Sequence, residues 1–326
     1  MNNVGLIVFD NIENSDKKDI LNIFTKLKKL ICMKIKRLFS TKLPEHSIKK
    51  ITVDQDLNLF FIKLPYSLDE LRKLRRFSVW RLQKAVLKAC RDNSIKKCFY
   101  PSKVPDEIIN DFGMKNPFSG NFIYASLLVN ILKLISVKKD MDIRDLDIAI
   151  LETNNRKLLY FFIRQLSPLA KFLTIITKEK ESAQKDMEDI FDETGLSVRV
   201  TDDIASGLDG ISILINIGNL DEFIPRKKVI CNAVVINYGS LKNSQVEFTG
   251  GIIDQINVGL PASMEESVDE EFINCYTGNE IAEIIFVNKL NGGTNVFKDF
   301  AEYNIMKGIS EQFEEEGYTI SLPIAI

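Results

Sequence analysis

The stretch that decides the fold runs from Asp145 to Lys178 and reads DLDIAILETNNRKLLYFFIRQLSPLAKFLTIITK. Leu146–Leu151 is apolar except for Asp147, which is typical of a buried strand, and Leu173–Thr177 is a second predicted strand. Between them, Lys157–Leu166 has apolar residues at helical spacing and follows a polar turn. The order of strand, turn, helix and strand predicts a βαβ unit.

The same alternation continues after this unit. Ser182–Glu193 is a predicted helix that Gly195 ends, and further apolar runs predict the strands Ser197–Val200, Ile211–Ile217, Val234–Tyr238 and Ile253–Val258. Several runs are apolar on both faces, as a parallel sheet covered by helices requires. The sequence therefore predicts a doubly wound, Rossmann-like α/β fold for this half. Thr277–Lys289 and Phe297–Glu316 are predicted closing helices.

The first part of the chain predicts a smaller α/β domain with the order β-α-β-β-α-β. A capping box at Ser67 and Glu70 opens its second helix, which is expected to run to about Arg91. This order fits a ferredoxin-like sandwich with an antiparallel sheet. The alternative is an α/β substrate domain with a partly parallel sheet. The remaining elements are expected at Val4–Phe9, 16–37, Ile48–Val53, Leu57–Leu64, Ile95–Tyr100 and, as a short helix, 106–112.

Charge is distributed unevenly along the chain, although the net charge is only −2. Residues 1–140 contain 27 Lys and Arg against 14 Asp and Glu, whereas residues 141–326 contain 16 against 31. Such a change of sign supports two domains. We predict a basic α/β domain at 1–115 and a Rossmann-like domain with closing C-terminal helices at 116–326.

The second helix of the basic domain carries many of its cations. A basic face of this kind can bind nucleic acid, an acidic ligand or the acidic second half, or it can simply be solvated. RNP aromatics, zinc-finger spacing and a Gly-x-x-Gly loop are missing, which makes nucleic-acid binding the less favoured reading. Trp80 is expected to be packed. The cations are Arg72, Lys73, Arg75, Arg76, Arg81, Lys84 and Lys88.

Composition narrows the possible chemistry. The single histidine, His46, excludes a histidine-rich metal site, and the five cysteines form no CxxC pair, as expected of reduced thiols in a cytoplasmic protein. No stretch approaches the roughly 20 apolar residues of a membrane span, and no basic region precedes an apolar one at the N-terminus. Abundant Lys, Ile and Asn with few Gly suggest an AT-rich bacterial genome. We therefore expect a cytoplasmic bacterial protein without a membrane partner.

A separate α/β domain followed by a helix and the first strand of a Rossmann domain resembles shikimate dehydrogenase, and the same plan occurs in glutamyl-tRNA reductase and methylene-tetrahydrofolate dehydrogenase. The resemblance covers about 118–260 by pattern. It implies an NADP-dependent oxidoreductase, with Lys178 and Lys180 placed for a 2′-phosphate. Lys63, Tyr66 and Asn121 are the candidates for acid–base roles in an interdomain cleft.

The sequence departs from these families at the first turn. Their strand enters a glycine-rich turn that lets phosphate approach backbone N–H groups. Here Glu152-Thr153-Asn154-Asn155 takes that place, followed by Arg156 and Lys157. Asn tolerates left-handed conformations, so the turn itself can be kept while side chains fill the pyrophosphate position. We assign no residue of this chain to the catalytic Lys and Asp of shikimate dehydrogenases.

Small polar residues gather where the predicted strands end. Ligands of doubly wound sheets bind at these carboxyl ends, so we predict a ligand site there. The alternative is that Asn and Gly only turn the chain. The predicted ligand- or cofactor-binding residues are Thr153, Asn154, Asn155, Asn216, Gly218, Asn219, Asn237, Gly239 and Ser240.

Three functions are compatible with these patterns. The first is a Rossmann-like protein with altered or lost dinucleotide binding that binds a small ligand or acts in regulation. The second is a divergent NADP-dependent oxidoreductase of the shikimate dehydrogenase type. The third is nucleic-acid binding through the basic N-terminal half. The sequence leaves a homo-oligomer open.

Overall fold

A computed structural model describes most of the chain. The described residues are 2–9, 43, 47–104, 114–115, 118–223, 225, 227–243, 245–266, 275–290 and 303–323. The helix expected at 16–37, the short helix expected at 106–112, His46 and the start of the last predicted helix lie outside them.

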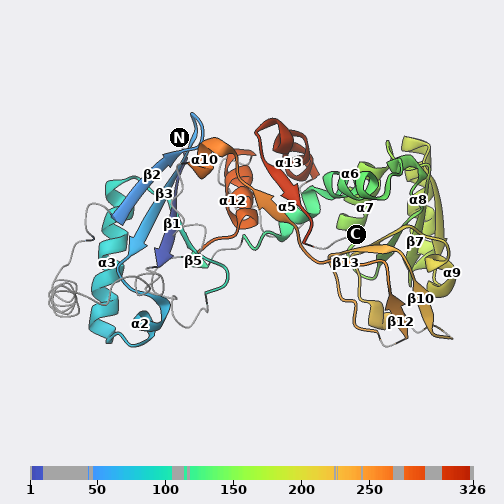
Figure 1. Cartoon of the computed structure of the whole chain (residues 1–326), viewed down its shortest axis with the longest axis horizontal. Coiled ribbons are helices and arrows are strands. Elements are labelled where there is room, and N and C mark those ends of the chain that lie inside the picture. Colours follow the sequence, from blue (N-terminus) through green and yellow to red (C-terminus); the bar gives the residue numbers. More distant parts are fainter. Residues whose placement is uncertain are drawn as a thin grey trace, which may run out of the picture. The chain divides into compact units, whose positions relative to one another are not determined.

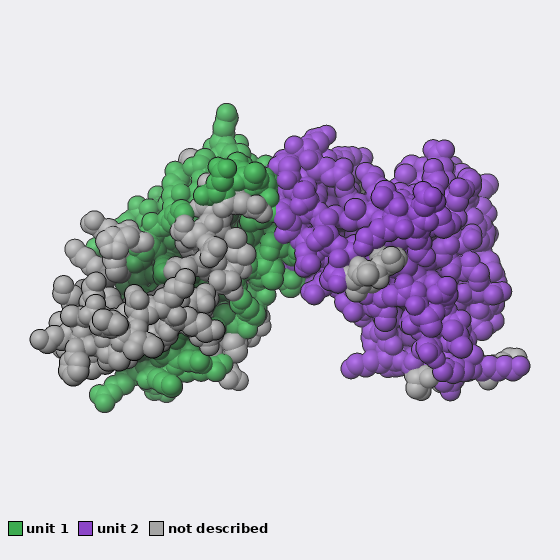
Figure 2. Space-filling model, in the orientation of Figure 1, with its two compact units in different colours: residues 1–119, 260–295 green, residues 120–259, 296–326 purple. Residues whose placement is uncertain are grey.

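The chain forms two compact units, each assembled from two separate segments (Figure 2). Unit 1 comprises residues 1–119 and 260–295, and unit 2 comprises 120–259 and 296–326. The domain boundary predicted after residue 115 stays a prediction, but residues 260–295 contribute to unit 1 and not, as the sequence suggested, to the Rossmann-like part.

In its described residues, unit 1 is built on a sheet with the strand order β2-β3-β1-β4-β5 (Figure 1). β1 is parallel to β3 and β4, and β4 is parallel to β5. Only β2 is antiparallel to its neighbour, β3, to which the predicted hairpin joins it. The strands are β1 (Asn2–Phe9), β2 (Ile48–Thr52), β3 (Leu57–Leu64), β4 (Lys97–Tyr100) and β5 (Met114–Lys115).

The ferredoxin-like prediction is wrong, and the partly parallel alternative is confirmed. A ferredoxin-like sheet is antiparallel throughout, whereas β1 runs in the same direction as both of its neighbours. Periodicity shows where strands lie but not their direction. Burial does carry that information, because every residue of β1 from Val4 to Phe9 is buried, as in interior strands of parallel sheets.

The helices of unit 1 start where the sequence indicates but differ in extent. Ser67 and Glu70 form the predicted capping box at the start of α2 (Leu68–Arg72). The predicted single helix is interrupted after Lys73 and resumes as α3 (Arg76–Asp92). From the C-terminal segment come α10 (Ala262–Glu265) and the almost wholly buried α12 (Gly278–Leu290).

Residues 275–290 are attached to the sheet of unit 1 by specific contacts. The hydroxyl of buried Tyr276 lies 3.0 Å from the carbonyl oxygen of Ile7 and 2.9 Å from that of Phe99. The carboxylate of Glu280 accepts hydrogen bonds from the backbone N–H groups of Thr277 and Ser102. These bonds explain why this segment belongs to unit 1.

Unit 2 contains, in its described residues, a six-stranded sheet that is parallel throughout, as predicted. Its order, β13-β11-β9-β6-β7-β8, is that of a Rossmann domain. The strands before β9 are added on one side of β6 and the later strands on the other, so the strand order reverses between β6 and β9. The strands are β6 (Ile148–Glu152), β7 (Phe172–Thr177), β8 (Ser197–Thr201), β9 (Ile213–Asn216), β11 (Val234–Asn237) and β13 (Ile252–Ile253).

Helices connect and cover these strands. α7 starts directly after the first turn, and Gly195, with a φ of 72°, ends α8 as predicted. The predicted sixth strand, Ile253–Val258, is divided in the structure. Ile252 and Ile253 join the six-stranded sheet as β13, whereas β14 pairs with β15. The other elements are α5 (Asn121–Ser126), α6 (Leu128–Lys139), η3 (Ile143–Asp145), α7 (Arg156–Leu166), α8 (Lys180–Thr194), α9 (Ile204–Leu208), η4 (Leu220–Glu222), β10 (Val229–Cys231), β12 (Val246–Phe248), β14 (Asn257–Gly259), α13 (Tyr303–Glu315) and β15 (Thr319–Ser321).

Among the described residues, no helix is both long and apolar enough to cross a membrane.

We predict that Tyr276→Phe destabilises unit 1 by about 1–3 kcal/mol, because two buried carbonyl groups lose their hydroxyl partner. Trp80, the only tryptophan of the chain, lies in unit 1 and reports its unfolding by fluorescence in a denaturant titration. Phe77→Ala is the control, since Phe77 is exposed and should change stability by no more than about 0.5 kcal/mol. Equal effects of both substitutions would contradict the role given to the hydroxyl.

Candidate functional site

The predicted site residues lie at the carboxyl ends of three strands in the sheet of unit 2. β6, β9 and β11 are neighbours in the sheet and run in the same direction, so the turns that follow them meet at their carboxyl ends. This is the edge at which doubly wound sheets bind ligands. The contacts made by each turn determine which polar groups remain available.

Glu152 is the last residue of β6, and its side chain holds the first turn together. Its side chain is only 1% exposed. One carboxylate oxygen accepts a hydrogen bond from the backbone N–H of Asn155 at 2.8 Å, and the other accepts one from the hydroxyl of Thr177 at 3.1 Å. Asn155 is the N-cap of α7, and its own side chain accepts from the N–H of Leu158. The backbone donor that a glycine-rich turn offers to phosphate is thus used by a carboxylate of the chain itself.

Arg156, the first residue of α7, is surrounded by carboxylates. Its guanidinium lies 2.9 Å from Asp186, 3.0 Å from Glu179 and 3.9 Å from Glu152. Burial acts to lower the pKa of Arg156, but the hydrogen bond to Glu179 and the charges of the carboxylates raise it above its ordinary value. The guanidinium at this turn is therefore already engaged in ion pairs with carboxylates of the chain.

The asparagines that end β9 and β11 bond to each other. The amide of Asn216, which is fully buried, donates to the side-chain oxygen of Asn237 at 2.8 Å and to the carbonyl of Ser240. The amide of Asn237 in turn donates to Asp254 at 2.6 Å. Their side-chain oxygens also accept from the N–H groups of Gly218 and Gly239. These amides hold the turns together.

The two glycines allow these turns to pack backbone against backbone. A Cβ on Gly218 would lie 2.8 Å from the backbone nitrogen of Thr153, and a Cβ on Gly239 would overlap the carbonyl oxygen of Gly218. The hydroxyl of Thr153 accepts from the N–H of Asn219, which forms an isolated bridge with Ser240. Asn154 is the exception in this group, because its side chain is exposed.

The lysines after β7 also have other contacts. The ammonium of Lys178 lies 4.8 Å from the ring centroid of Phe223, and Lys180 lies 3.7 Å from Asp202. The predicted 2′-phosphate contact would have to compete with these interactions.

The tyrosines near this edge are held in their protonated form. Burial raises the pKa of Tyr124, with a further contribution from Asp254, and burial raises the pKa of Tyr238. Tyr160 has its pKa raised to about 12 by burial and by a hydrogen bond to Asp186. At neutral pH these groups can donate hydrogen bonds but cannot serve as general bases.

The candidate acid–base residues lie in different units. Lys63 belongs to β3 and Tyr66 follows it in unit 1, whereas Asn121 opens α5 in unit 2. Their meeting in a cleft stays a prediction. Among the described residues, no group of three or more His, Cys, Asp or Glu side chains could hold a metal ion.

A second candidate surface lies on α3. Trp80 is 46% exposed and Phe77 is 62% exposed, so the expectation that Trp80 is packed is wrong. The two rings stack with their centroids 5.8 Å apart, and cations cover them, with Lys84 3.8 Å from the Trp80 centroid and Arg81 4.8 Å from that of Phe77. These rings provide an exposed aromatic surface among basic residues.

The sequence did not reveal the partners that decide these contacts. Asp186 lies 30 residues after Arg156, and Asp254 lies 17 residues after Asn237, so no local motif joins them. Glu152 directly follows an apolar strand, and once its side chain is buried there the carboxylate needs hydrogen-bond donors.

No family model matches this chain, and no curated protein does. Solved structures that are similar include L-tryptophan dehydrogenase from Nostoc punctiforme (TM-score 0.28, 12% identity, covering 97% of this chain and 84% of that one) and dipicolinate synthase A chain from Bacillus subtilis (0.32, 11%, 89% and 96%). Shikimate 5-dehydrogenase from Listeria monocytogenes is a third (0.26, 11%, 72% and 78%). The Rossmann-like assignment of unit 2 rests on its own strand order and strand directions.

Proposed function

We propose that this Rossmann-like protein binds a small polar ligand or acts in regulation, without holding a dinucleotide pyrophosphate at its first turn. The observation that carries the proposal is the buried carboxylate of Glu152 on the N–H of Asn155. A pyrophosphate would need this donor, and it would also have to approach a buried negative charge.

The charges around the turn support the same conclusion. Glu152, Glu179 and Asp186 surround the single guanidinium of Arg156, so the cluster keeps an excess of negative charge. Such a cluster repels a phosphate dianion and favours a neutral or cationic ligand. Asn154, with its exposed side chain beside the cluster, is the proposed contact for that ligand.

The first test concerns the dinucleotides. We expect NAD⁺ and NADPH at about 1 mM to leave the unfolding temperature unchanged, since a hundredfold excess over the dissociation constant would stabilise the protein by about 2.7 kcal/mol. Calorimetric titration with the same compounds gives an independent reading. Binding of NADPH in the micromolar range, with protection of residues 153–157 from hydrogen exchange, would instead favour the divergent NADP-dependent oxidoreductase.

The second test asks whether Glu152 occupies the place of a phosphate. Glu152→Ala should lower the stability of unit 2 by about 1–3 kcal/mol, because Asn155 and Thr177 lose a buried acceptor. Millimolar pyrophosphate should restore part of this loss in the variant and have no effect on the natural protein. Hydrogen exchange of β6 and α7 measures both effects.

Glu179→Ala is the matched control for this rescue. It removes another carboxylate from Arg156, but Glu179 is exposed, and the N–H of Asn155 donates to Glu152 instead. Equal rescue of both variants would mean that pyrophosphate responds to net charge alone, and the proposed replacement would then be wrong.

A second candidate function is nucleic-acid binding by α3, which the exposed Trp80 and Phe77 favour. Single-stranded RNA should quench the fluorescence of Trp80, and the affinity should fall steeply with salt, because Lys and Arg contacts release counterions from the phosphates. Replacing Arg72, Arg75 and Arg76 by Glu should abolish the quenching, whereas Lys138→Glu in unit 2 should not. Unchanged fluorescence at low salt would remove this candidate.

A further inference from the structure

We infer that the outer edge of unit 2, at β8, binds an extended segment of a partner protein in which apolar and basic residues alternate. The segment would add to the sheet as a further strand beside β8 and place its side chains along α8. This binding is independent of the strand-end site discussed above. It uses the side of β8 that does not pair with β7, together with the exposed surface of α8.

The first observation is that β8 is an edge strand without the usual protection. Among the described residues it pairs with β7 alone. Natural edges are commonly blocked by proline, an outward lysine or a bulge, because unpaired N–H and C=O groups recruit other strands. β8 reads Ser-Val-Arg-Val-Thr, and its one cation, Arg199, is bonded to the hydroxyl of Ser206.

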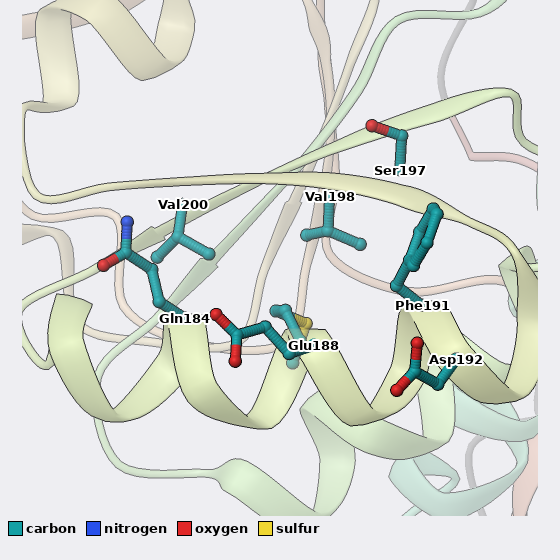
Figure 3. A pocket seen from close by; sticks show the side chains of 8 residues that line it. Gln184, Glu188, Phe191, Asp192, Ser197, Val198 and Val200 are labelled. Carbon is teal, nitrogen blue, oxygen red and sulfur yellow. The ribbon is translucent and has the colours of Figure 1, made fainter.

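The second observation is a groove of about 530 Å³ between α8 and β8. Figure 3 shows Phe191, Gln184 and Glu188 projecting from the helix toward the strand that carries Val198 and Val200. Phe191 is 54% exposed, and both valines are half-buried. Since residues i and i+2 of a strand point to the same face, the two valines form one apolar wall with Phe191.

The third observation is the sign of the charges at this groove. Glu188 and Asp192 are exposed carboxylates that line it, and no lysine or arginine lines it. Residues at every second position of an added strand share one face, so the basic residues of the segment would all face α8. Their aliphatic stems would lie on the apolar wall, and their ammonium groups would reach the carboxylates of the helix. Basic residues in the segment would meet Glu188 and Asp192.

A second copy of this chain fits the edge less well. Antiparallel pairing of β8 with its own copy around a twofold axis at Arg199 would set two arginines opposite each other, which is unfavourable. It would also bring together two α8 helices with the same acidic groups. Charge complementarity thus favours a basic partner.

The experiment uses the full chain and a seven-residue peptide of alternating valine and lysine, acetylated and amidated at its ends. Calorimetric titration measures affinity, and hydrogen exchange locates the contact. We expect new protection at residues 197–201. Replacing Glu188 and Asp192 by lysine should weaken binding at least about tenfold, because two attractive pairs become repulsive. The matched control is Glu181→Lys with Asp189→Lys, which changes the same charge on exposed residues of α8 that do not line the groove.

A peptide with N-methyl groups on alternate backbone amides separates strand addition from simple charge attraction, because it keeps the side chains but loses ladder donors. It should bind at least about tenfold more weakly if a strand is added. Equal affinity of the two peptides, protection outside β8, or equal losses in both charge-reversal variants would overturn the inference. So would a concentration-dependent dimer whose formation protects residues 197–201, since the occupant would then be a second copy.

Discussion

A buried carboxylate at the end of β6 determines how the first turn of the Rossmann-like unit is held. Glu152 has no solvent to stabilise its charge, and it therefore depends on the N–H of Asn155, the hydroxyl of Thr177 and the nearby guanidinium of Arg156. An ionised group in this position has to be hydrogen-bonded or paired. The N–H of Asn155 belongs to the turn at which nucleotide-binding Rossmann domains hold phosphate. The fold is thus kept while this donor is used inside the chain, which is the basis of the function proposed above.

The same principle applies to the next two strands. Asn216 and Asn237 stand where ligand contacts were expected, but their amides connect β9, β11 and Asp254. Gly218 and Gly239 remove side chains so that backbone can meet backbone. Hydrogen bonds therefore join the ends of these strands to one another. The exposed side chain of Asn154 can form hydrogen bonds with another molecule without breaking this network.

The sequence predicted those features that depend on neighbours along the chain. The βαβ unit, the capping box at Ser67 and the stop at Gly195 all follow from local spacing, and the structure confirms them. The direction of β1, the exposure of Trp80 and the attachment of α12 to unit 1 depend on contacts between distant segments. The polar residues at the strand ends were located correctly, but whether an amide binds a ligand or another amide is decided by partners 17 to 30 residues away. No periodicity reveals such a pairing.

The attachment of residues 275–290 to unit 1 also bears on how the chain can be divided into fragments. The buried hydroxyl of Tyr276 and the carboxylate of Glu280 complete a sheet whose first strand ends at Phe9. Residues 120–259, which belong to unit 2, separate this segment from the strands that it covers. Unit 2 is discontinuous as well, because it also includes residues 296–326. No single cut in the chain can therefore yield both units intact, and an isolated fragment 1–119 would lack the partners that Tyr276 and Glu280 supply.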